Sequence, residues 1–342
     1  MKISVLGTGR WASCVALCLD RKNHNVLMWE REHEGRPEST LFTTRKNQYV
    51  TLSENVDFTH DLKKALDYGD VVVISILSQH LDSFFQVVKA VPGYEKKRYI
   101  LAMKGIEATT GRRLSEIVMD NGVNKENIAV WVGPGHVQNI SAGQPTDMLI
   151  SAYRPDFAKE LIDEFRNPGL LDLVYSEDIV GSEIGAAAKN VMGIAAGILE
   201  GSNLEQKKGP LMPASVKEIG KFINAMGGDE VSAQGLAFLG DFQATLFDKN
   251  SKNLTFGTQI VKQKTTDREI LQSTIDVGSV EGIMTAKALI KNMIRFNARV
   301  SNDKQLKMPI TESVDAVVSN RVPIDRAGLY ISGKITEALD LN

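Results

Sequence analysis

The chain has little cysteine. Among 342 residues only Cys14 and Cys18 carry thiols, and the five histidines are scattered along the sequence. So few thiols exclude a disulfide scaffold, and no Cys/His spacing fits zinc, so we expect no metal site. The four-residue separation of the two cysteines is possible metal or redox spacing on one helix face. Two small buried hydrophobic side chains are the commoner outcome.

Long apolar runs are also missing. The longest stretch without a Lys, Arg, Asp or Glu covers residues 127–146 and is full of Gly, Pro, Asn and Gln. A membrane-spanning helix needs about 20 mostly apolar residues, so we expect no membrane insertion. The opening MKISVLGTGR has one charge before an apolar run that Gly7 breaks, which is not a signal peptide. We therefore expect a cytoplasmic protein.

Neither sign of charge is in excess. Forty Lys and Arg face forty-two Asp and Glu, which gives a formal net charge of −2. This balance argues against a nucleic-acid partner, and no arginine–aromatic interleaving suggests single-stranded binding. With 43% hydrophobic and 24% charged residues the composition is that of a globular protein. At about 150 residues per domain, the length suggests two domains.

A glycine-rich motif follows the first apolar segment. Residues 2–6 (KISVL) predict a strand, residues 14–19 a helix, and between them lies a Gly-x-Gly-x-x-Ala pattern formed by Gly7, Gly9 and Ala12. Such a pattern permits a tight turn, close approach of backbone to a pyrophosphate, and close helix packing. The phosphates would sit at the positive end of the helix dipole. The motif predicts a dinucleotide site.

The choice of dinucleotide depends on the end of the second predicted strand, residues 25–29. Glu30 follows it, twenty-three residues beyond Gly7, where a carboxylate holds the ribose hydroxyls. That carboxylate repels a 2′-phosphate and favours NAD. Arg31 and Arg36 follow closely and suit such a phosphate, so NADP stays open.

Strands and helices then alternate to about residue 176. A helix is predicted at residues 61–68, and further strands at residues 70–76, 99–103, 128–132 and 147–152. This alternation predicts a Rossmann-type, doubly wound α/β domain over residues 1–177. Ligands bind beyond the carboxyl ends of such strands. Three loops fall there, at residues 78–80, 104–107 and 133–136.

Helical spacing dominates afterwards. Residues 181–201 are dense in Ala and Gly, which lets helices approach closely, and we predict the central helix of an all-α domain over residues 178–342. The same Gly/Ala-rich helix makes a homodimer plausible.

Several polar residues stand out in apolar surroundings. Lys189 lies inside the Ala/Gly-rich helix, where it either reaches water or sits in a cleft as an acid–base group. Lys104 follows a strand at the ligand-binding edge, although surface lysines in turns are common. Asp241 and Thr245 either line a pocket from one helix face, or form a cap and a buried threonine bonded to its own helix. Ser251–Asn253 suits an anion or is merely a loop. His80 and His136 have no Ser or Cys elbow to pair with, so a triad is not expected.

Taken together, these segments resemble the NAD(P)-dependent glycerol-3-phosphate dehydrogenase family from Met1 to about Pro309. Any one motif is weak, but their order along the chain is specific. The matching pieces are Gly7-x-Gly9-x-Trp11, Trp29 with Arg31, Lys104-Gly105-Ile106-Glu107, Gly133-Pro134 with Pro145-Thr146, Lys189-Asn190-Val191, Gly235-Leu236-Ala237 with Gly240-Asp241 and Thr245, Ser251-x-Asn253, Phe256-Gly257, Val280-Glu281-Gly282 and Met308-Pro309-Ile310.

The resemblance implies a Rossmann domain followed by a helical domain. It also implies a reaction, in which dihydroxyacetone phosphate and NAD(P)H interconvert with glycerol 3-phosphate, a glycerophospholipid precursor. It implies Lys189 as the lysine that protonates the carbonyl oxygen, with Lys104 and Asp241 beside it as catalytic residues. Implied substrate contacts are Lys104, Gly133, Gly135, Asn190, Thr245, Ser251, Lys252 and Asn253. Implied cofactor contacts are Gly7, Gly9, Arg10, Trp11, Ala12, Glu30, Arg31, Tyr49, Lys104, Val137, Lys252 and Glu281.

The chain departs from the family pattern around the substrate pocket. Lys252 stands where the family has arginine, which keeps the charge but loses the bidentate fork that suits phosphate. The usual Arg-Gly-x-x-Glu-Met reads here as residues 214–219, ASVKEI. Lys207 and Lys208 are candidates to replace the lost arginine charge. The alternatives are a relative that reduces another small phosphorylated or carboxylated ketone, and a non-catalytic NAD-binding sensor.

Overall fold

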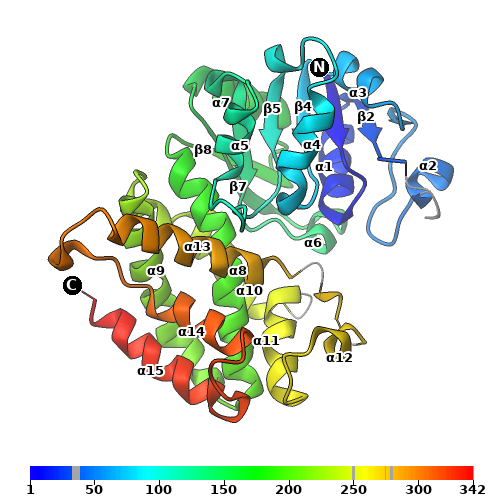
Figure 1. The fold of residues 1–342 in the computed structure, drawn as a ribbon. Coiled ribbons are helices and arrows are strands. Elements are labelled where there is room, and N and C mark those ends of the chain that lie inside the picture. Colours follow the sequence, from blue (N-terminus) through cyan, green and yellow to red (C-terminus); the bar gives the residue numbers. More distant parts are fainter. Residues whose placement is uncertain (33–38, 249–250, 274, 278–279, 342) are drawn as a thin grey trace. The chain divides into compact units, whose positions relative to one another are not determined.

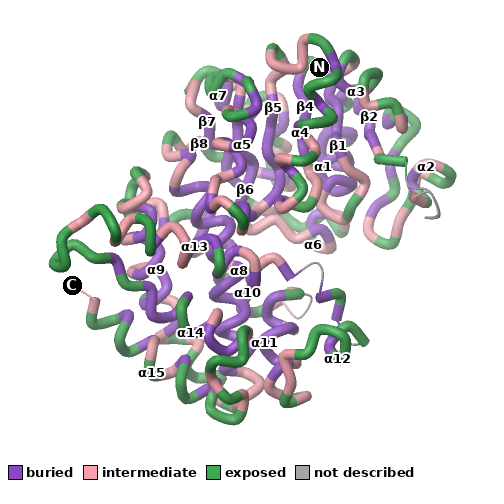
Figure 2. The backbone as a smooth tube through the Cα atoms, viewed as in Figure 1, coloured by how far each residue is buried: buried purple, intermediate pink, exposed green. Residues whose placement is uncertain are grey.

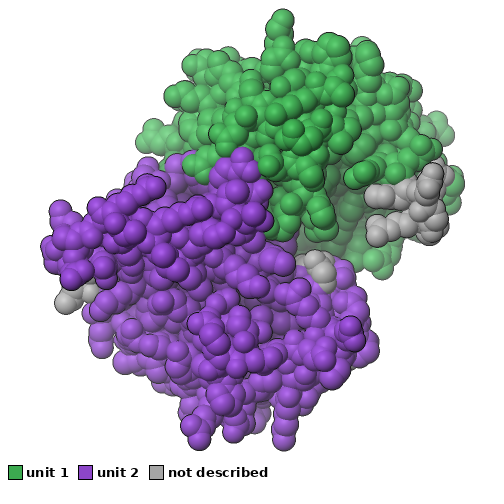
Figure 3. All heavy atoms as spheres, in the orientation of Figure 1, with its two compact units in different colours: residues 1–103, 114–179 green, residues 104–113, 180–342 purple. Residues whose placement is uncertain are grey.

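The computed structural model describes residues 1–32, 39–248, 251–273, 275–277 and 280–341. The chain divides into two compact units, coloured separately in Figure 3. Unit 1 contains Met1–Met103 and Leu114–Ile179, and unit 2 contains Lys104–Arg113 and Val180–Asn342. Relative to the predicted domain ranges, residues 104–113 group with the second unit. Lys104 is therefore part of the helical unit.

Unit 1 is built on one sheet of eight strands (Figure 1). Their order is β3-β2-β1-β4-β5-β6-β7-β8, and all neighbours are parallel except β6 and β7. The first six follow the Rossmann order. The bounds are β1 Lys2–Leu6, β2 Asn25–Trp29, β3 Val56–Thr59, β4 Val71–Ile74, β5 Arg98–Leu101, β6 Ile128–Val132, β7 Thr146–Ala152 and β8 Leu171–Ser176. This confirms the predicted α/β fold.

Two strands, β3 and β8, were not predicted from the sequence. They are the two edges of the sheet, and both leave some side chains partly exposed. An edge strand is covered less completely than a central one, so its sequence lacks the continuous apolar run seen in β4, whose four residues are all buried.

The helices of unit 1 connect the strands and pack against the sheet. They are α1 Arg10–Asp20, α2 Thr40–Thr44, α3 Leu62–Tyr68, α4 Leu81–Val88, α5 Leu114–Asp120, α6 Val137–Ser141 and α7 Pro155–Phe165. Cys14 and Cys18 are free and buried in α1, 0% and 4% exposed. They serve as small apolar side chains in the core.

Unit 2 is helical, as predicted. Its α-helices are α8 Ile179–Gly201, α9 Lys208–Ala225, α10 Asp241–Phe247, α11 Lys252–Lys262, α12 Arg268–Gln272, α13 Glu281–Asn297, α14 Pro309–Val318 and α15 Ala327–Leu339. Figure 2 shows α8 buried along nearly its whole length. A Cβ at Gly197 would lie 2.1 Å from the Leu254 carbonyl oxygen, so the small residues of α8 allow backbone contact with α11. Among the described residues, no helix has both the length and the apolar character to cross a bilayer.

Candidate active site

Asp241 is the buried centre of a charged cluster in unit 2. It opens α10, directly after a π-helical turn at Leu236–Gly240 in which the Gly240 N–H donates to the Gly235 carbonyl at 3.2 Å. Such turns widen the helix and often occur at functional sites. The Asp241 carboxylate is 0% exposed. A buried carboxylate requires charged or hydrogen-bonding partners.

Two lysines provide those partners. The Lys104 ammonium forms an ion pair with Asp241 Oδ2, and the Lys189 ammonium lies 3.1 Å from Oδ1. The lysine side chains are only 19% and 12% exposed. Lys104 comes from the loop after β5 and Lys189 from the middle of α8, so distant parts of the sequence meet at one carboxylate. Lys189 is therefore mostly buried and paired with Asp241, so its ammonium does not extend freely into solvent.

Burial and the neighbouring charges shift the pKa values of Lys104 and Asp241. Burial lowers the pKa of Lys104, and the nearby Lys189 charge lowers it further, whereas the Asp241 charge opposes both. Burial by itself would raise the pKa of Asp241, but the ammonium groups of Lys104 and Lys189 outweigh it, and the net pKa is lowered. Asp241 is therefore ionised, and the two lysine side chains lie on either oxygen of its carboxylate. Buried, charge-coupled groups of this kind are common where proton transfer occurs.

Thr245 orients Lys189. Its Oγ1 accepts a hydrogen bond from the Lys189 ammonium at 3.0 Å and donates to the Asp241 carbonyl at 2.8 Å. The hydroxyl thus bonds its own helix, as the buried-threonine alternative has it, while Asp241 is the first residue of α10 and not its cap. One lysine ammonium has three N–H donors. Thr245 accepts one of these, and the ammonium is also ion-paired with Asp241 Oδ1.

A chain of amides continues from this cluster. Asn190, next to Lys189 on α8, donates to Glu281 Oε2 at 3.2 Å and accepts from Asn253 at 3.0 Å. Asn253 Oδ1 in turn accepts from the Gly282 N–H at 3.0 Å. Burial raises the pKa of Glu281 to about 7, against the opposing charges of Lys189, Lys104 and Lys252. The network joins α8, α11 and the first turn of α13 within unit 2.

The neighbouring anion candidates have distinct environments. Ser251 caps α11 by accepting from the Leu254 N–H at 3.3 Å, so this segment is a helix start. The Lys252 ammonium lies 3.5 Å from Asp276 and its side chain is 44% exposed. The other charge candidate, Lys208, pairs with Glu200 near the end of α8. Glu200 lies eleven residues beyond Lys189 on α8, a rise of about 16 Å along the helix.

Unit 1 contains the glycine turn. Gly7 has φ of +125°, and a Cβ there would lie 2.3 Å from the Ser75 carbonyl oxygen, so only glycine fits. At Gly9 the direction of a Cβ is open, with no atom within 4 Å. Gly9 caps α1 without a side-chain hydrogen bond, and the first turn contains no acidic residue. Such a helix end fits the pyrophosphate of a dinucleotide.

Glu30 directly follows β2, and its carboxylate accepts two hydrogen bonds. Thr8 Oγ1 donates to Oε1 at 2.6 Å, and the Ser39 N–H donates to Oε2 at 3.2 Å. Sequence reasoning missed Thr8, whose hydroxyl between the two glycines was the available signal. Arg31 is exposed, and Arg36 lies outside the described residues.

The other cofactor and substrate candidates of unit 1 lie on α1, on α6 and in neighbouring loops. The Arg10 guanidinium lies 5.4 Å from the ring centre of Tyr49 and donates to Gln138 at 2.9 Å. A Cβ at Gly135 would lie 2.6 Å from the Trp11 ring, so the indole lies against that glycine. Ala12 and Val137 are buried, 0% and 2% exposed. Gly133 has φ of +129° next to Met148.

A Rossmann-ordered sheet together with a helical unit that contains a lysine–aspartate–lysine cluster defines a two-domain NAD(P)-dependent dehydrogenase. Comparison with known proteins agrees. The models of the N-terminus and the C-terminus of NAD-dependent glycerol-3-phosphate dehydrogenase match residues 2–158 and 178–328. The chain belongs to this family.

Relatives and structures are similar over nearly the whole chain. The chain is 30% identical to the NAD(P)+ glycerol-3-phosphate dehydrogenase of Prosthecochloris aestuarii over 334 residues, 96% of either protein. Its identity to the Fusobacterium nucleatum enzyme of the same name is 31% over 325 residues, 93% of this chain and 92% of that one. The fold is shared with the glycerol-3-phosphate dehydrogenase crystal structure from Coxiella burnetii, with a TM-score of 0.83, 24% identity, and coverage of 99% of this chain and 98% of that one.

Proposed function

We propose that the chain catalyses the reversible, NAD(P)-dependent interconversion of dihydroxyacetone phosphate and sn-glycerol 3-phosphate. The observation that carries this proposal is the pair of lysines on the buried carboxylate of Asp241. Reduction of a ketone creates negative charge on the carbonyl oxygen, and this cluster offers both positive charge and an exchangeable proton. Membership of the family makes the triose phosphate the first substrate to test.

In this proposal Lys189 gives a proton to the forming alkoxide oxygen. The nicotinamide, when bound, supplies the hydride that reduces the carbonyl carbon. Thr245 and Asp241 hold the Lys189 ammonium in place, while Lys104 adds a second positive charge. After the proton leaves, Lys189 is neutral and regains a proton from water. In the reverse direction the same amine accepts the hydroxyl proton.

The start of α11 is the proposed phosphate contact. Lys252, whose side chain is partly exposed at the first position of that helix, supplies positive charge near the N-terminal end of the helix dipole. Lysine binds phosphate as a point charge without the two parallel hydrogen bonds of arginine. We therefore propose weaker retention of the phosphate, and a higher KM, than an arginine at this position would give.

The end of β2 supports a preference for NADH. Glu30 is already held by Thr8 and Ser39, in the position from which a carboxylate accepts hydrogen bonds from ribose hydroxyls. The same negative charge opposes a 2′-phosphate. The residues that would hold the dinucleotide are Gly7, Gly9, Arg10 and Glu30 of unit 1. A cytoplasmic location and a homodimer complete the proposal and are tested by cell fractionation and sedimentation.

The test is an absorbance assay with purified protein, dihydroxyacetone phosphate, and NADH or NADPH. We expect oxidation of NADH, with glycerol 3-phosphate as the product. Lys189→Met is expected to lose about 10²- to 10⁴-fold of the turnover while binding NADH normally. Lys287→Met, at an exposed lysine of α13, is the control and keeps full activity. Protein that binds NADH but oxidises neither cofactor would overturn the assignment, and other phosphorylated or carboxylated ketones would then be assayed.

A further inference from the structure

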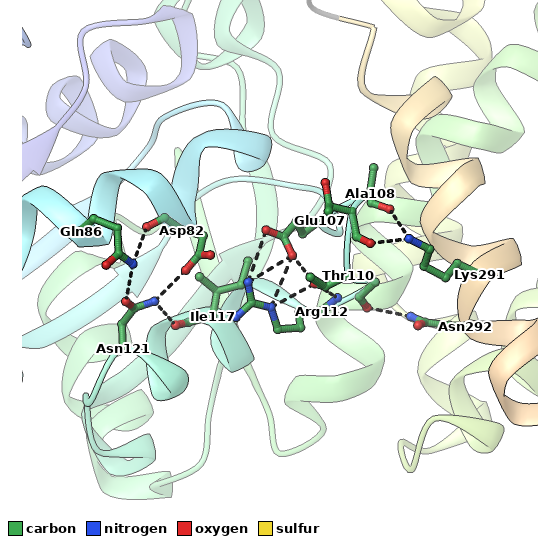
Figure 4. A network of polar contacts seen from close by, with 12 residues as sticks. Asp82, Gln86, Glu107, Ala108, Thr110, Arg112, Ile117, Asn121, Lys291 and Asn292 are labelled. Atoms are coloured by element: carbon green, nitrogen blue, oxygen red, sulfur yellow. Dashed lines mark hydrogen bonds and ion pairs between the residues drawn. The ribbon is translucent and has the colours of Figure 1, made fainter.

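The segment that begins with Lys104 forms a closed turn, residues 104–113 (Figure 4). Within it the Glu107 N–H donates to the Arg112 carbonyl at 3.0 Å, and Ile106 and Arg113 form an antiparallel bridge. The Arg112 guanidinium lies 3.2 Å from the Glu107 carboxylate, which also accepts from Thr110 Oγ1. These bonds close residues 106–113 into one hydrogen-bonded loop that begins two residues after Lys104.

Helix α13 holds the tip of this segment by its backbone. The Lys291 ammonium donates to the carbonyls of Ala108, at 3.4 Å, and Thr109. Asn292 donates to the Gly111 carbonyl at 2.8 Å. On the same helix face as Lys291, Arg295 donates to the Thr110 carbonyl. Four consecutive carbonyls, at residues 108–111, therefore accept from three side chains of one helix.

The segment approaches α13 closely at Gly111. Gly111 has φ of +79°, and a Cβ there would lie 2.3 Å from Asn292 Oδ1. A side chain at residue 111 would displace the Asn292 amide and would also be strained at this positive φ. Glycine at residue 111 therefore permits this short contact. The contact fixes which residue of the segment lies opposite Asn292 of α13.

The far end of the segment is held by α8. Arg113 donates to Glu183 at 2.8 Å, and the Glu183 side chain is only 2% exposed. Glu183 lies on α8, six residues before Lys189. Ile106, near the start of the segment, is fully buried in the core of unit 2. The segment is thus fixed at its tip by α13 and at its end by the helix that carries Lys189.

We propose that Lys291, Asn292 and Arg295 are positioning residues for Lys104, and that they act on catalysis through the backbone of residues 108–111. Lys104 belongs to a segment held rigidly against α13, so its ammonium keeps its place on Asp241. The proposal rests on the function proposed above, because it takes Lys104 as a working group of the active site. It gives the middle of α13 a role in the reaction without contact with substrate.

The test compares variants of Lys291. Lys291→Met keeps the length of the side chain and removes the donors, and we expect kcat for dihydroxyacetone phosphate reduction to fall about 10- to 100-fold, as small misplacement of a catalytic group does. The KM for NADH stays unchanged. Lys291→Arg, which donates to two carbonyls, restores most of kcat. Lys287→Met, at an exposed position one turn earlier on the same helix, is the matched control, and its kinetics should be unchanged.

A double-mutant cycle with Lys104→Met separates positioning from a general structural effect. If Lys291 acts through Lys104, Lys291→Met changes kcat little in the Lys104→Met background. A full, multiplicative loss in that background would overturn the proposal, as would normal kcat in Lys291→Met alone. Full activity in Lys104→Met would instead contradict the proposed function. If Lys291→Met does not fold, as judged by circular dichroism, Arg295→Gln takes its place in the same cycle.

Discussion

Lys104 and Lys189, eighty-five residues apart in the sequence, hold the two oxygens of a single buried carboxylate, that of Asp241. This relationship determines the charge of the site. Two ammonium groups this close repel each other, and the carboxylate between them offsets that repulsion. The cluster places two lysine amines in a poorly solvated site, where positive charge strongly stabilises a developing alkoxide.

Removal of that carboxylate charge is the first prediction. Asp241→Asn keeps the shape but leaves two cations without their counterion, and breaking such a buried pair costs about 3 kcal/mol of unfolding free energy. We expect this loss in urea unfolding, together with a fall in kcat of at least tenfold. Asp67→Asn, which breaks the exposed Lys63–Asp67 pair, is the control and should leave both unchanged. An Asp241→Asn protein as stable and active as the parent would refute the electrostatic account of the cluster.

The two glycines of the first turn are predicted to respond differently. In Gly7→Ala the new methyl group meets the Ser75 carbonyl oxygen, at a positive φ, so we expect a loss of about 3 kcal/mol or more in stability. Gly9→Ala places its methyl group in open space and should leave the melting temperature unchanged. It should nevertheless raise the Kd for NADH about tenfold, measured by fluorescence titration, because backbone approach to the pyrophosphate is blocked. Equal NADH affinity in Gly9→Ala would place the pyrophosphate elsewhere.

Glu30 is predicted to set the cofactor preference. Glu30→Ser removes the charge that opposes a 2′-phosphate and shortens the acceptor for the ribose hydroxyls. We expect the ratio of kcat/KM for NADH to that for NADPH to fall about tenfold or more, because like-charge repulsion costs several kcal/mol. Glu32→Ser, at an exposed carboxylate two residues further on, is the control. If the ratio of the two kcat/KM values is unchanged in Glu30→Ser, another residue determines the preference between NADH and NADPH.

Glu218 is predicted to make stability depend on pH. It is fully buried on α9 and accepts from the N–H groups of Ile310 and Thr311, at 2.7 and 2.9 Å, so it caps α14. Burial raises its pKa from 4.5 to about 7, although hydrogen bonds from Thr311 and Ile310 oppose the shift. Because the pKa is raised in the folded state, Glu218 binds its proton more tightly when the protein is folded. The stabilisation from this proton is complete below pH 4.5 and is lost as the pH rises through 7.

The pH dependence is measured by urea unfolding between pH 5 and 8. The shift corresponds to about 3 kcal/mol, so the parent should lose part of its stability across this range. Glu281 titrates in the same window, and comparison of the parent with Glu218→Gln isolates the share of Glu218. The Gln variant should show a shallower slope whatever its absolute stability. Parallel slopes in the two proteins would mean that Glu218 keeps its charge when folded.

Much of the fold could be predicted from local patterns. The strands β1, β2 and β6 lie where the apolar runs predicted them, because strands covered on both faces need continuous apolar sequence. The Ala/Gly-rich segment is α8, because its neighbours pack against its backbone. The edge strands β3 and β8 were missed because partial exposure permits polar residues that hide the pattern.

The site was predicted as residues and not as contacts. Lys104, Lys189, Asp241 and Thr245 were candidates, yet no local pattern states that they meet, since their contact depends on a β5 loop, α8 and α10 coming together. Lys208, offered as a substitute charge, is paired with Glu200, a contact that no local pattern indicates. The anchors Lys291 and Arg295 carried no signal, because cations four residues apart on a helix usually face solvent.

By itself, then, the sequence determined the glycine turn after β1, the strands inside the sheet and the second, helical unit. These depend on short-range properties: glycine conformation, apolar periodicity and the sizes of neighbouring side chains. Only the tertiary structure decided which charges share a carboxylate, which acid caps α14, and which helix holds the Lys104 segment. Those outcomes depend on distances between residues that are far apart in the chain. Burial strengthens the electrostatic interaction of each such pair because water no longer screens it.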